Sequence, residues 1–297
     1  MEQKIGFLGF GNMAQAMAAG WRRSGAVGEG QMLACAKHWD KLCAAAAAYG
    51  VQPCRTAEEV VRGADVIIVA VKPYLVEEVL TPLRGLLAEG TSQADGPQPA
   101  QRPRLAEEVP SVDGSPASKD LHVAEKAVVS VAAGWLCDRF AALLPGVHHI
   151  SIMPNTPVRV CEGVILMEDR HTLTEAQAAQ VRKLLGTLGL VEVIEGRLMG
   201  IGGAVSGCGP AFASMFLEAL GDAGVKHGLP RAAAYRLAAQ MIAGTGRLQL
   251  ETGAHPGAMK DAVCSPGGTT IVGVAALERG GMRAAVIDAV DAIQNKR

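Results

Sequence analysis

The sequence predicts an α/β domain with a parallel sheet, followed by an all-α domain. Short apolar runs alternate with helical patterns up to about residue 195, which is the order of elements expected for a sheet with crossover helices. From about residue 196 only helical patterns remain. Because the chain of 297 residues is long enough for two domains, we expect them to span 1–195 and 196–297.

The N-terminal stretch predicts what the first domain binds. Ile5–Leu8 is a short apolar run typical of a buried strand, and a helical pattern follows it. Between them, Gly9, Gly11 and Ala14 form a G-x-G-x-x-A pattern. Gly9 permits a tight turn, Gly11 lets a pyrophosphate approach the backbone, and Ala14 lets the helix pack closely on the strand. The alternative is an ordinary glycine-rich turn, but the position in the first strand–helix unit favours a Rossmann-like dinucleotide-binding domain.

The end of the second expected strand, at 32–35, favours NADP over NAD. In NAD enzymes this strand tends to end in an acidic residue that binds the ribose 2′-hydroxyl. Here the strand is followed by Ala36, Lys37 and His38, and a cation suits a 2′-phosphate. The alternative is that Lys37 and His38 are simply solvated.

The other elements of the first domain follow from local signals. The patterns T-x-x-E at Thr56 and T-x-x-Q at Thr174 predict capped helix starts, and Gly50 suits the end of an Ala-rich helix. The apolar run at 65–71 predicts the central strand. We expect helices at 39–49, 57–62, 76–88, 137–144 and 175–188, and strands at 51–53, 65–71, 127–131, 148–153, 162–167 and 190–194.

The loops that follow strands are where ligands bind in an open α/β sheet. Val71, Lys72 and Pro73 follow the central strand, and 132–134 follow the next one, so we expect both loops near the cofactor. Lys72 could act as a chemical acid or merely support packing and charge. The loop at 154–157 carries two prolines that fix it at the rim of the sheet.

The composition changes at Gly90. From there to about Lys126 the chain is rich in Pro, Gln, Ser and acidic residues, which predicts a disordered segment or a loose loop. The segment connects a helix back to a strand, so we expect it at the edge opposite the ligand crevice and outside the site.

The second domain is predicted to be a bundle of helices. Ser206-Gly-Cys-Gly-Pro210 is expected to open a helix that ends at His227, and further helices are expected at about 230–251, 256–263, 269–279 and 282–294. The helix at 230–251 is rich in Ala and Met on every side, and such a helix must be buried. This predicts a homodimer with intertwined helices.

The stretch Cys264–Ile271 predicts an anion site in the second domain. It places two adjacent glycines and three hydroxyl side chains just before a helix, which makes a nest suited to a substrate carboxylate. The alternative is a helix N-cap with a glycine turn.

The bulk composition excludes several classes of protein. A net charge of −1 gives no electrostatic case for binding nucleic acid or an anionic membrane surface. No apolar run reaches the ~18 residues of a membrane helix, and the N-terminus enters a strand directly, so we expect no signal peptide. The 7 cysteines contain no C-x-x-C pair, which indicates reduced thiols in the cytoplasm. Neither they nor the 7 histidines have the spacing of metal ligands, so no metal is expected.

Together the motifs resemble one enzyme family. G-F-L-G-F-G-N-M-A, V-A-V-K-P, V-A-A-G-W, M-P-N-T-P, S-G-C-G-P-A and D-A-V-C-S-P-G-G-T-T-I occur in the order seen in pyrroline-5-carboxylate reductases. The likeness runs from Ile5 to about Ala292 and is broken only at 90–126; the last motif is the specific one. It implies reduction of 1-pyrroline-5-carboxylate to L-proline with NADPH or NADH, which is the last step of proline synthesis. It also implies interlocked dimers, often assembled into rings of dimers.

The resemblance assigns a role to each candidate residue. The pyrophosphate of the cofactor would be bound by the loop of Leu8, Gly9, Phe10, Gly11, Asn12 and Met13, and the 2′-phosphate by Ala36 and Lys37. Thr56 would lie beside the ribose. The nicotinamide would lie between two loops, formed by Ala70, Val71, Lys72 and Pro73 and by Ala132, Ala133 and Gly134. The substrate carboxylate would be held by Ser265, Gly267, Gly268 and Thr269. Thr270 is the catalytic candidate, because its hydroxyl would meet the ring nitrogen.

Two stretches of the sequence depart from the family pattern. Cys264 stands where Ser or Thr is expected, and a thiol beside the carboxylate clamp predicts sensitivity to thiol reagents. Gly253 and Ala254 lack an acidic residue found in some relatives, which weakens any case for a carboxylate near the site.

Two rival functions stay open from the sequence. A β-hydroxyacid dehydrogenase, or another NADP-dependent imine reductase of the same plan, would share the first domain, but Lys226 and Lys260 lack the Asn that β-hydroxyacid dehydrogenases place about four residues on. A nucleotide-binding regulator without catalysis is the second rival, and the intact nest with Thr270 argues against it. A hydroxyl is a weak acid, so we expect Thr270 to orient an iminium protonated by solvent rather than to protonate it.

Overall fold

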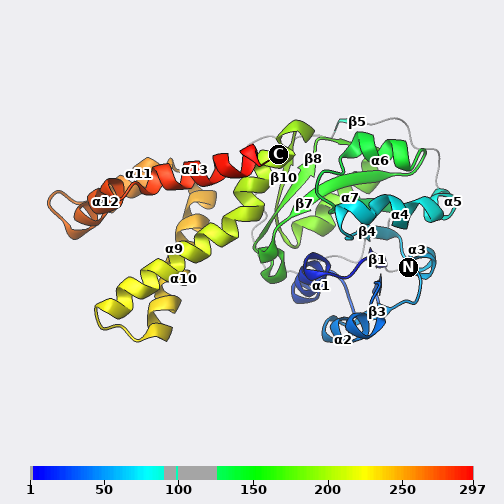
Figure 1. The fold of residues 1–297 in the computed structure, drawn as a ribbon, viewed down its shortest axis with the longest axis horizontal. Helices are drawn as coiled ribbons and strands as arrows, with labels where there is room; N and C mark the ends of the chain where they lie inside the picture. Colours follow the sequence, from blue (N-terminus) through cyan, green and yellow to red (C-terminus); the bar gives the residue numbers. More distant parts are fainter. Residues whose placement is uncertain (1–2, 90–97, 100–125, 297) are drawn as a thin grey trace. The chain divides into compact units, whose positions relative to one another are not determined.

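The computed structural model describes residues 3–89, 98–99 and 126–296 (Figure 1). Contacts divide the chain into two compact units between Gly207 and Cys208. The boundary predicted at 195/196 falls where a long helix begins, whereas the division by contacts falls within that helix. The disorder predicted for 90–126 concerns residues that lie, except for 98–99 and 126, outside the described part of the chain.

The first unit is built on one sheet. Among the described residues, eight strands form it in the order β10-β8-β7-β6-β4-β1-β2-β3. Its strands are β1 (Ile5–Leu8), β2 (Met32–Cys35), β3 (Val51–Pro53), β4 (Val66–Val69), β6 (Ala127–Ser130), β7 (His149–Pro154), β8 (Gly163–Glu168) and β10 (Gly189–Ile194). A separate antiparallel pair joins β5 (Gln98–Pro99) to β9 (Arg170–His171).

The sheet is parallel from β3 to β7 but not beyond. β8 pairs with β7 in the antiparallel sense, and β10 runs parallel to β8. A parallel partner for β7 would need a crossover connection of a dozen or more residues, and 155–162 is shorter than that. The sheet is therefore mixed at this end, and the predicted α/β class is confirmed.

Helices cover both faces of the sheet. One core packs β1 against α1 (Asn12–Ser24), α2 (Trp39–Tyr49) and α7 (Glu175–Gly186), with Trp21 fully buried. The other core packs the opposite face against α3 (Ala57–Gly63), α4 (Val76–Leu80), α5 (Arg84–Ala88) and α6 (Cys137–Leu143). Short 3₁₀ turns complete the unit at Pro73–Leu75, Thr81–Leu83, Thr156–Val160 and Gly196–Leu198.

Two predicted helices differ from the observed ones. The single helix expected at 76–88 is interrupted by a 3₁₀ turn that contains Pro82. Proline has no N–H for the α-helical hydrogen bond and clashes with the preceding turn. The helix expected to begin at Ser206 begins earlier, as α8 (Met199–Gly203), and continues through a π-helical segment, Ala204–Cys208, into α9 (Gly209–Lys226).

The second unit is helical and leaves much apolar surface exposed. After α9 it contains α10 (Arg231–Thr252), α11 (Pro256–Ala262), α12 (Thr269–Arg279) and α13 (Met282–Asn295). Met215, Leu237 and Val272 are 70%, 61% and 65% exposed. The continuous helix Gly196–Lys226 also has the length and hydropathy by which membrane spans are recognised. The expectation that no run in the chain reaches this length is therefore wrong, because the helix starts earlier than expected.

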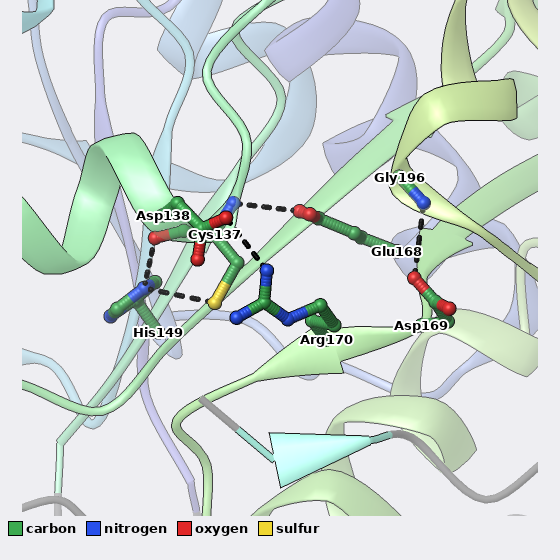
Figure 2. Close-up of polar contacts among 7 residues, drawn as sticks. All are labelled: Cys137, Asp138, His149, Glu168, Asp169, Arg170 and Gly196. Carbon is green, nitrogen blue, oxygen red and sulfur yellow. Dashed lines mark hydrogen bonds and ion pairs between the residues drawn. The ribbon is translucent and has the colours of Figure 1, made fainter. Parts of the chain in front are cut away.

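A buried polar cluster joins α6, β8 and the start of the long helix (Figure 2). The Glu168 carboxylate is 3% exposed and accepts the Cys137 N–H at 2.8 Å, at the start of α6. The neighbouring Asp169 accepts the Gly196 N–H at 3.0 Å. Cys137 Sγ lies 3.5 Å from His149 Nε2. Two adjacent carboxylates thus hold two chain segments that are far apart in sequence.

Burial shifts the pKa values of two groups in this cluster, Glu168 and Cys137. It raises the pKa of Glu168 from 4.5 to about 7, and the nearby Asp169 and Asp138 add to the rise, whereas the Cys137 N–H and Arg170 oppose it. Burial also raises the pKa of the Cys137 thiol to about 12. Cys137 is therefore a neutral thiol at physiological pH, and Glu168 gains or loses its proton near neutrality.

The raised pKa of Glu168 predicts a specific pH dependence of stability. Between pH 4.5 and about 7 the folded state holds this proton and the unfolded state does not, so the free energy of unfolding falls as the pH rises through this window. Burial lowers the pKa values of His149 and His171, which gives the opposite slope, so the test is a difference between variants. We expect Glu168→Gln, which keeps an oxygen for the Cys137 N–H, to gain on the order of 2 kcal/mol relative to wild type between pH 5 and pH 8.

The measurement is urea unfolding of both proteins across this pH range. Glu192→Gln makes the same chemical change at an exposed position of β10 and serves as the control. A difference between wild type and Glu168→Gln that stays constant with pH would show that Glu168 does not titrate in this window.

Candidate functional site

The register of the parallel strands brings the predicted cofactor residues to one edge of the sheet. Leu8 lies beside Cys35 and Val69, and Val69 lies beside Ser130. Parallel strands that end in register send their following loops out at the same edge, which is where ligands bind in this class of fold. The loops that meet there are 9–13, 36–38, 70–73 and 131–134.

The three small residues of the first loop meet different constraints. Gly9 has a φ of +88°, and a Cβ on it would lie 2.8 Å from the Ala70 carbonyl oxygen, so only glycine fits. Gly11 is exposed, and among the described residues no atom beyond its chain neighbours and its own helix backbone lies within 4 Å of the place where its Cβ would be. Ala14 is fully buried under the sheet. The protein therefore leaves the space beside Gly11 open, as the approach of a ligand to the backbone requires.

The start of α1 favours an anion. Gly11 is the N-cap and provides no side chain for the first amides, and the first turn contains no acidic residue. These N–H groups therefore point outward at the positive end of a 13-residue helix. Burial raises the pKa of the adjacent Cys35 to about 11, so this thiol adds no negative charge at neutral pH. The loop thus fits a pyrophosphate.

Cations gather beyond the ends of β2 and β3. Lys37 is exposed after β2, and the Arg55 guanidinium after β3 stacks on the Trp39 ring at 3.6 Å. The Thr56 hydroxyl accepts the Glu59 N–H at 3.2 Å, which confirms the predicted helix cap. Arg55 was not predicted as a site residue; the signal for it was a cation at the end of the strand adjacent to that of Lys37.

The loops after β4 and β6 are joined through a tryptophan. Lys72 is exposed and precedes the 3₁₀ turn that begins at Pro73. Gly134 is exposed and has a φ of +76°. The indole Nε1 of Trp135 donates to the Pro73 carbonyl at 2.8 Å. Trp135 ends the V-A-A-G-W motif, but no site role was predicted for it.

A second link connects the M-P-N-T-P and S-G-C-G-P motifs. Asn155 is buried, its Oδ1 accepts the Val164 N–H at 2.9 Å, and its Nδ2 donates to the Ser206 carbonyl at 2.9 Å. In an α-helix the donor to that carbonyl would be the residue four positions later, which is Pro210 and has no N–H. Asn155 supplies a hydrogen bond to this carbonyl instead, within the π-helical segment Ala204–Cys208.

The predicted substrate residues gather in the second unit, at the start of α12. Gly267 has a φ of +67°, and the Gly268 N–H donates to the Ser265 carbonyl at 3.0 Å in a tight turn. A Cβ on Gly268 would lie 2.3 Å from Ser265 Oγ and 3.1 Å from the Ser265 carbonyl oxygen, so a larger residue would displace the Ser265 side chain. No side chain caps α12, whose first two residues are the exposed Thr269 and Thr270. The free amides and hydroxyls form a nest that fits a carboxylate.

Two family models match the chain. The model described as pyrroline-5-carboxylate reductase dimerisation matches residues 197–297, and the one described as NADP oxidoreductase, coenzyme F420-dependent, matches residues 4–91. The first model covers the helices of the second unit and residues 197–207 before them. The second model covers the glycine loop and the strands up to β4.

Relatives and solved structures agree with the models over the full chain. The chain is 40% identical to the pyrroline-5-carboxylate reductase of Treponema pallidum over 97% of both chains, and 38% identical to that of Escherichia coli over 100% of this chain and 97% of the other. The solved pyrroline carboxylate reductase of Plasmodium falciparum, with NADP bound, has a TM-score of 0.77 at 25% identity over 99% of this chain and 96% of the other. That of Coxiella burnetii has a TM-score of 0.77 at 26% identity, over 100% and 97%. The chain therefore belongs to the pyrroline-5-carboxylate reductase family.

Proposed function

We propose that this protein reduces 1-pyrroline-5-carboxylate to L-proline with NADPH. The observation that carries the proposal is the likeness to curated reductases over the whole chain, 40% identity over 97% of the Treponema pallidum enzyme, rather than over the dinucleotide-binding part alone. The Plasmodium falciparum enzyme has the same fold, and its solved structure contains bound NADP, which supports NADPH as the cofactor. NADPH supplies the hydride that reduces the C=N bond.

The first unit holds the cofactor. Residues 8–13 bind its pyrophosphate, since the space beside Gly11 is open and the amides of the first turn of α1 point outward. Lys37 binds the 2′-phosphate, with Ala36 beside it and the Arg55–Trp39 stack close to the same strand ends. Thr56 lies at the ribose. Residues 70–73 and 132–134 surround the nicotinamide.

The second unit orients the substrate. The amides of Gly268 and Thr269, with Ser265 and Gly267, hold the carboxylate at the N-terminus of α12, and this fixes the ring for hydride transfer. The Thr270 hydroxyl hydrogen-bonds the ring nitrogen, whose charge changes as the hydride arrives. Because a hydroxyl is a weak acid, the proton on the nitrogen comes from solvent.

The exposed apolar helices of the second unit are covered in a homodimer. The family model that matches 197–297 is one of dimerisation, and α9 and α10 leave large apolar side chains such as Met215 and Leu237 exposed in the single chain. This burial explains the long apolar helix Gly196–Lys226 without a membrane. The family resemblance favours further assembly into a ring of dimers, and the seven free cysteines favour a reducing, cytoplasmic setting.

The first experiment is oxidation of NADPH, and separately of NADH, by the purified protein with 1-pyrroline-5-carboxylate. We expect rapid oxidation with proline as the product, faster with NADPH. Binding of both cofactors without oxidation would mean that the substrate is wrong, and other cyclic imines would be tried next. No turnover with any imine would favour the non-catalytic rival.

Lys37→Ala tests the proposed 2′-phosphate contact. Loss of a charge-assisted hydrogen bond to the phosphate should raise the KM for NADPH by roughly tenfold and leave that for NADH unchanged. Lys41→Ala, which removes a nearby exposed charge on α2, is the control. An equal change for both cofactors would contradict the assignment.

Thr270→Ala tests the hydroxyl at the ring nitrogen. We expect kcat to fall by roughly 10- to 100-fold with little change in the Kd of NADPH, since the hydroxyl acts only on the reacting nitrogen. Thr270→Ser keeps the hydroxyl and should restore most of the rate. Wild-type turnover in Thr270→Ala would exclude this role.

A further inference from the structure

Trp135 connects three segments at the carboxyl edge of the sheet. Its side chain is 2% exposed, and its indole Nε1–H donates to the Pro73 carbonyl at 2.8 Å. Its own carbonyl accepts the Ser151 hydroxyl of β7 at 2.6 Å, and its N–H donates to the Ala132 carbonyl at 3.2 Å. Trp135 is thus held by β7 on one side and holds the loop after β4 on the other.

The ring of Trp135 also makes contacts with neighbouring side chains. The Arg139 guanidinium stacks on it at 3.7 Å and pairs with Glu77 of α4 at 3.2 Å. The Phe140 ring meets it edge-on, with 5.3 Å between centroids. Since Glu77 lies in the first turn of the helix that follows Pro73, the Arg139–Glu77 ion pair ties the same loop to α6.

This link lies where the backbone no longer connects the two strands. β4 and β6 are joined up to the Val131 N–H, which donates to the Val69 carbonyl at 3.1 Å. Beyond it, within the part of the chain that the structure describes, no further backbone hydrogen bond joins 70–73 to 132–135. The next bond between the two loops is that from the Trp135 indole to Pro73. Beyond the backbone hydrogen bonds, the Trp135 indole thus makes the hydrogen bond that directly joins the two loops.

We propose that Trp135 is a positioning residue for hydride transfer, whose indole N–H fixes the separation of the two loops between which the nicotinamide lies. The proposal rests on the proposed function for the placement of the nicotinamide. Hydride transfer requires the reacting atoms to be held at near-contact distance, and a misplacement of about 1 Å can lower a rate by up to about a hundredfold. Loosening the loops should therefore lower kcat while leaving the adenosine end of the cofactor site intact.

A second buried tryptophan, Trp21, provides a control for the loss of stability that replacing a buried tryptophan causes. Trp21 is fully buried, and its Nε1 donates to the Leu184 carbonyl at 3.1 Å, which ties α1 to α7. α1 runs back from the carboxyl edge, and Trp21 lies in its last turn, away from the loops. Trp135→Phe and Trp21→Phe each remove one indole N–H from one backbone carbonyl and keep an aromatic ring.

The test compares these two variants in the full-length protein. Both should lower Tm to a similar extent, but only Trp135→Phe should lower kcat, by roughly tenfold, and change the emission of bound NADPH excited directly at the nicotinamide. The Kd of adenosine 2′,5′-bisphosphate, which lacks the nicotinamide, should stay within about twofold of wild type in both. Wild-type kcat and emission in Trp135→Phe, or equal losses in both variants, would overturn the proposal.

Two further measurements test the proposal if Trp135→Phe does not fold or if the proposed substrate is wrong. Should Trp135→Phe fail to fold, Ser151→Ala removes the hydroxyl that holds Trp135 from β7, and a smaller change of the same kind in kcat and emission is expected; an unchanged pair would overturn the proposal. The emission of bound NADPH needs no imine. A wild-type protein that bound NADPH without reducing 1-pyrroline-5-carboxylate would therefore overturn the proposed substrate, and the emission would still decide the role of Trp135.

Discussion

The common register of β1, β2, β4 and β6 is the constraint on which the rest of the first unit depends. Leu8, Cys35, Val69 and Ser130 end their strands side by side, so four loops leave the sheet at one edge. The close approach of the Gly9 turn to the Ala70 carbonyl is possible only in this register and only for glycine. A shift of one residue would exchange the side chains that a strand presents to the two cores and would separate the loops. The proposed cofactor site thus depends on strand pairing more than on any single side chain.

At and beyond the ends of the strands, hydrogen bonds from side chains to the backbone join segments that the backbone hydrogen bonds of the sheet no longer connect. Trp135 reaches the Pro73 carbonyl, Asn155 reaches the Ser206 carbonyl, and Glu168 holds the Cys137 N–H. Each of these polar groups is buried, where an unmade hydrogen bond is costly, so each bond restricts its segment to one position. Two of the three are linked to proline, which removes a backbone donor and interrupts regular structure.

The second unit follows a different logic. Its helices bury few residues within one chain, and the apolar side chains that α9 and α10 expose need a partner. The same unit presents the glycine turn and free amides at the start of α12. The family model of dimerisation and the proposed carboxylate site therefore fall in the same set of helices.

The sequence by itself determined the α/β class, most element positions, the glycine loop and the nest before α12, because each depends on local spacing and on residue type. It did not reveal the long helix through Ala204–Cys208, the antiparallel β8, or the roles of Trp135 and Asn155. Their partners lie 62 and 51 residues away along the chain, so no local pattern predicts these bonds. Arg55 likewise gained its neighbour Trp39 only when β2 and β3 paired. Contacts between distant segments come from the pairing of strands and the packing of helices, and only the tertiary structure decides them.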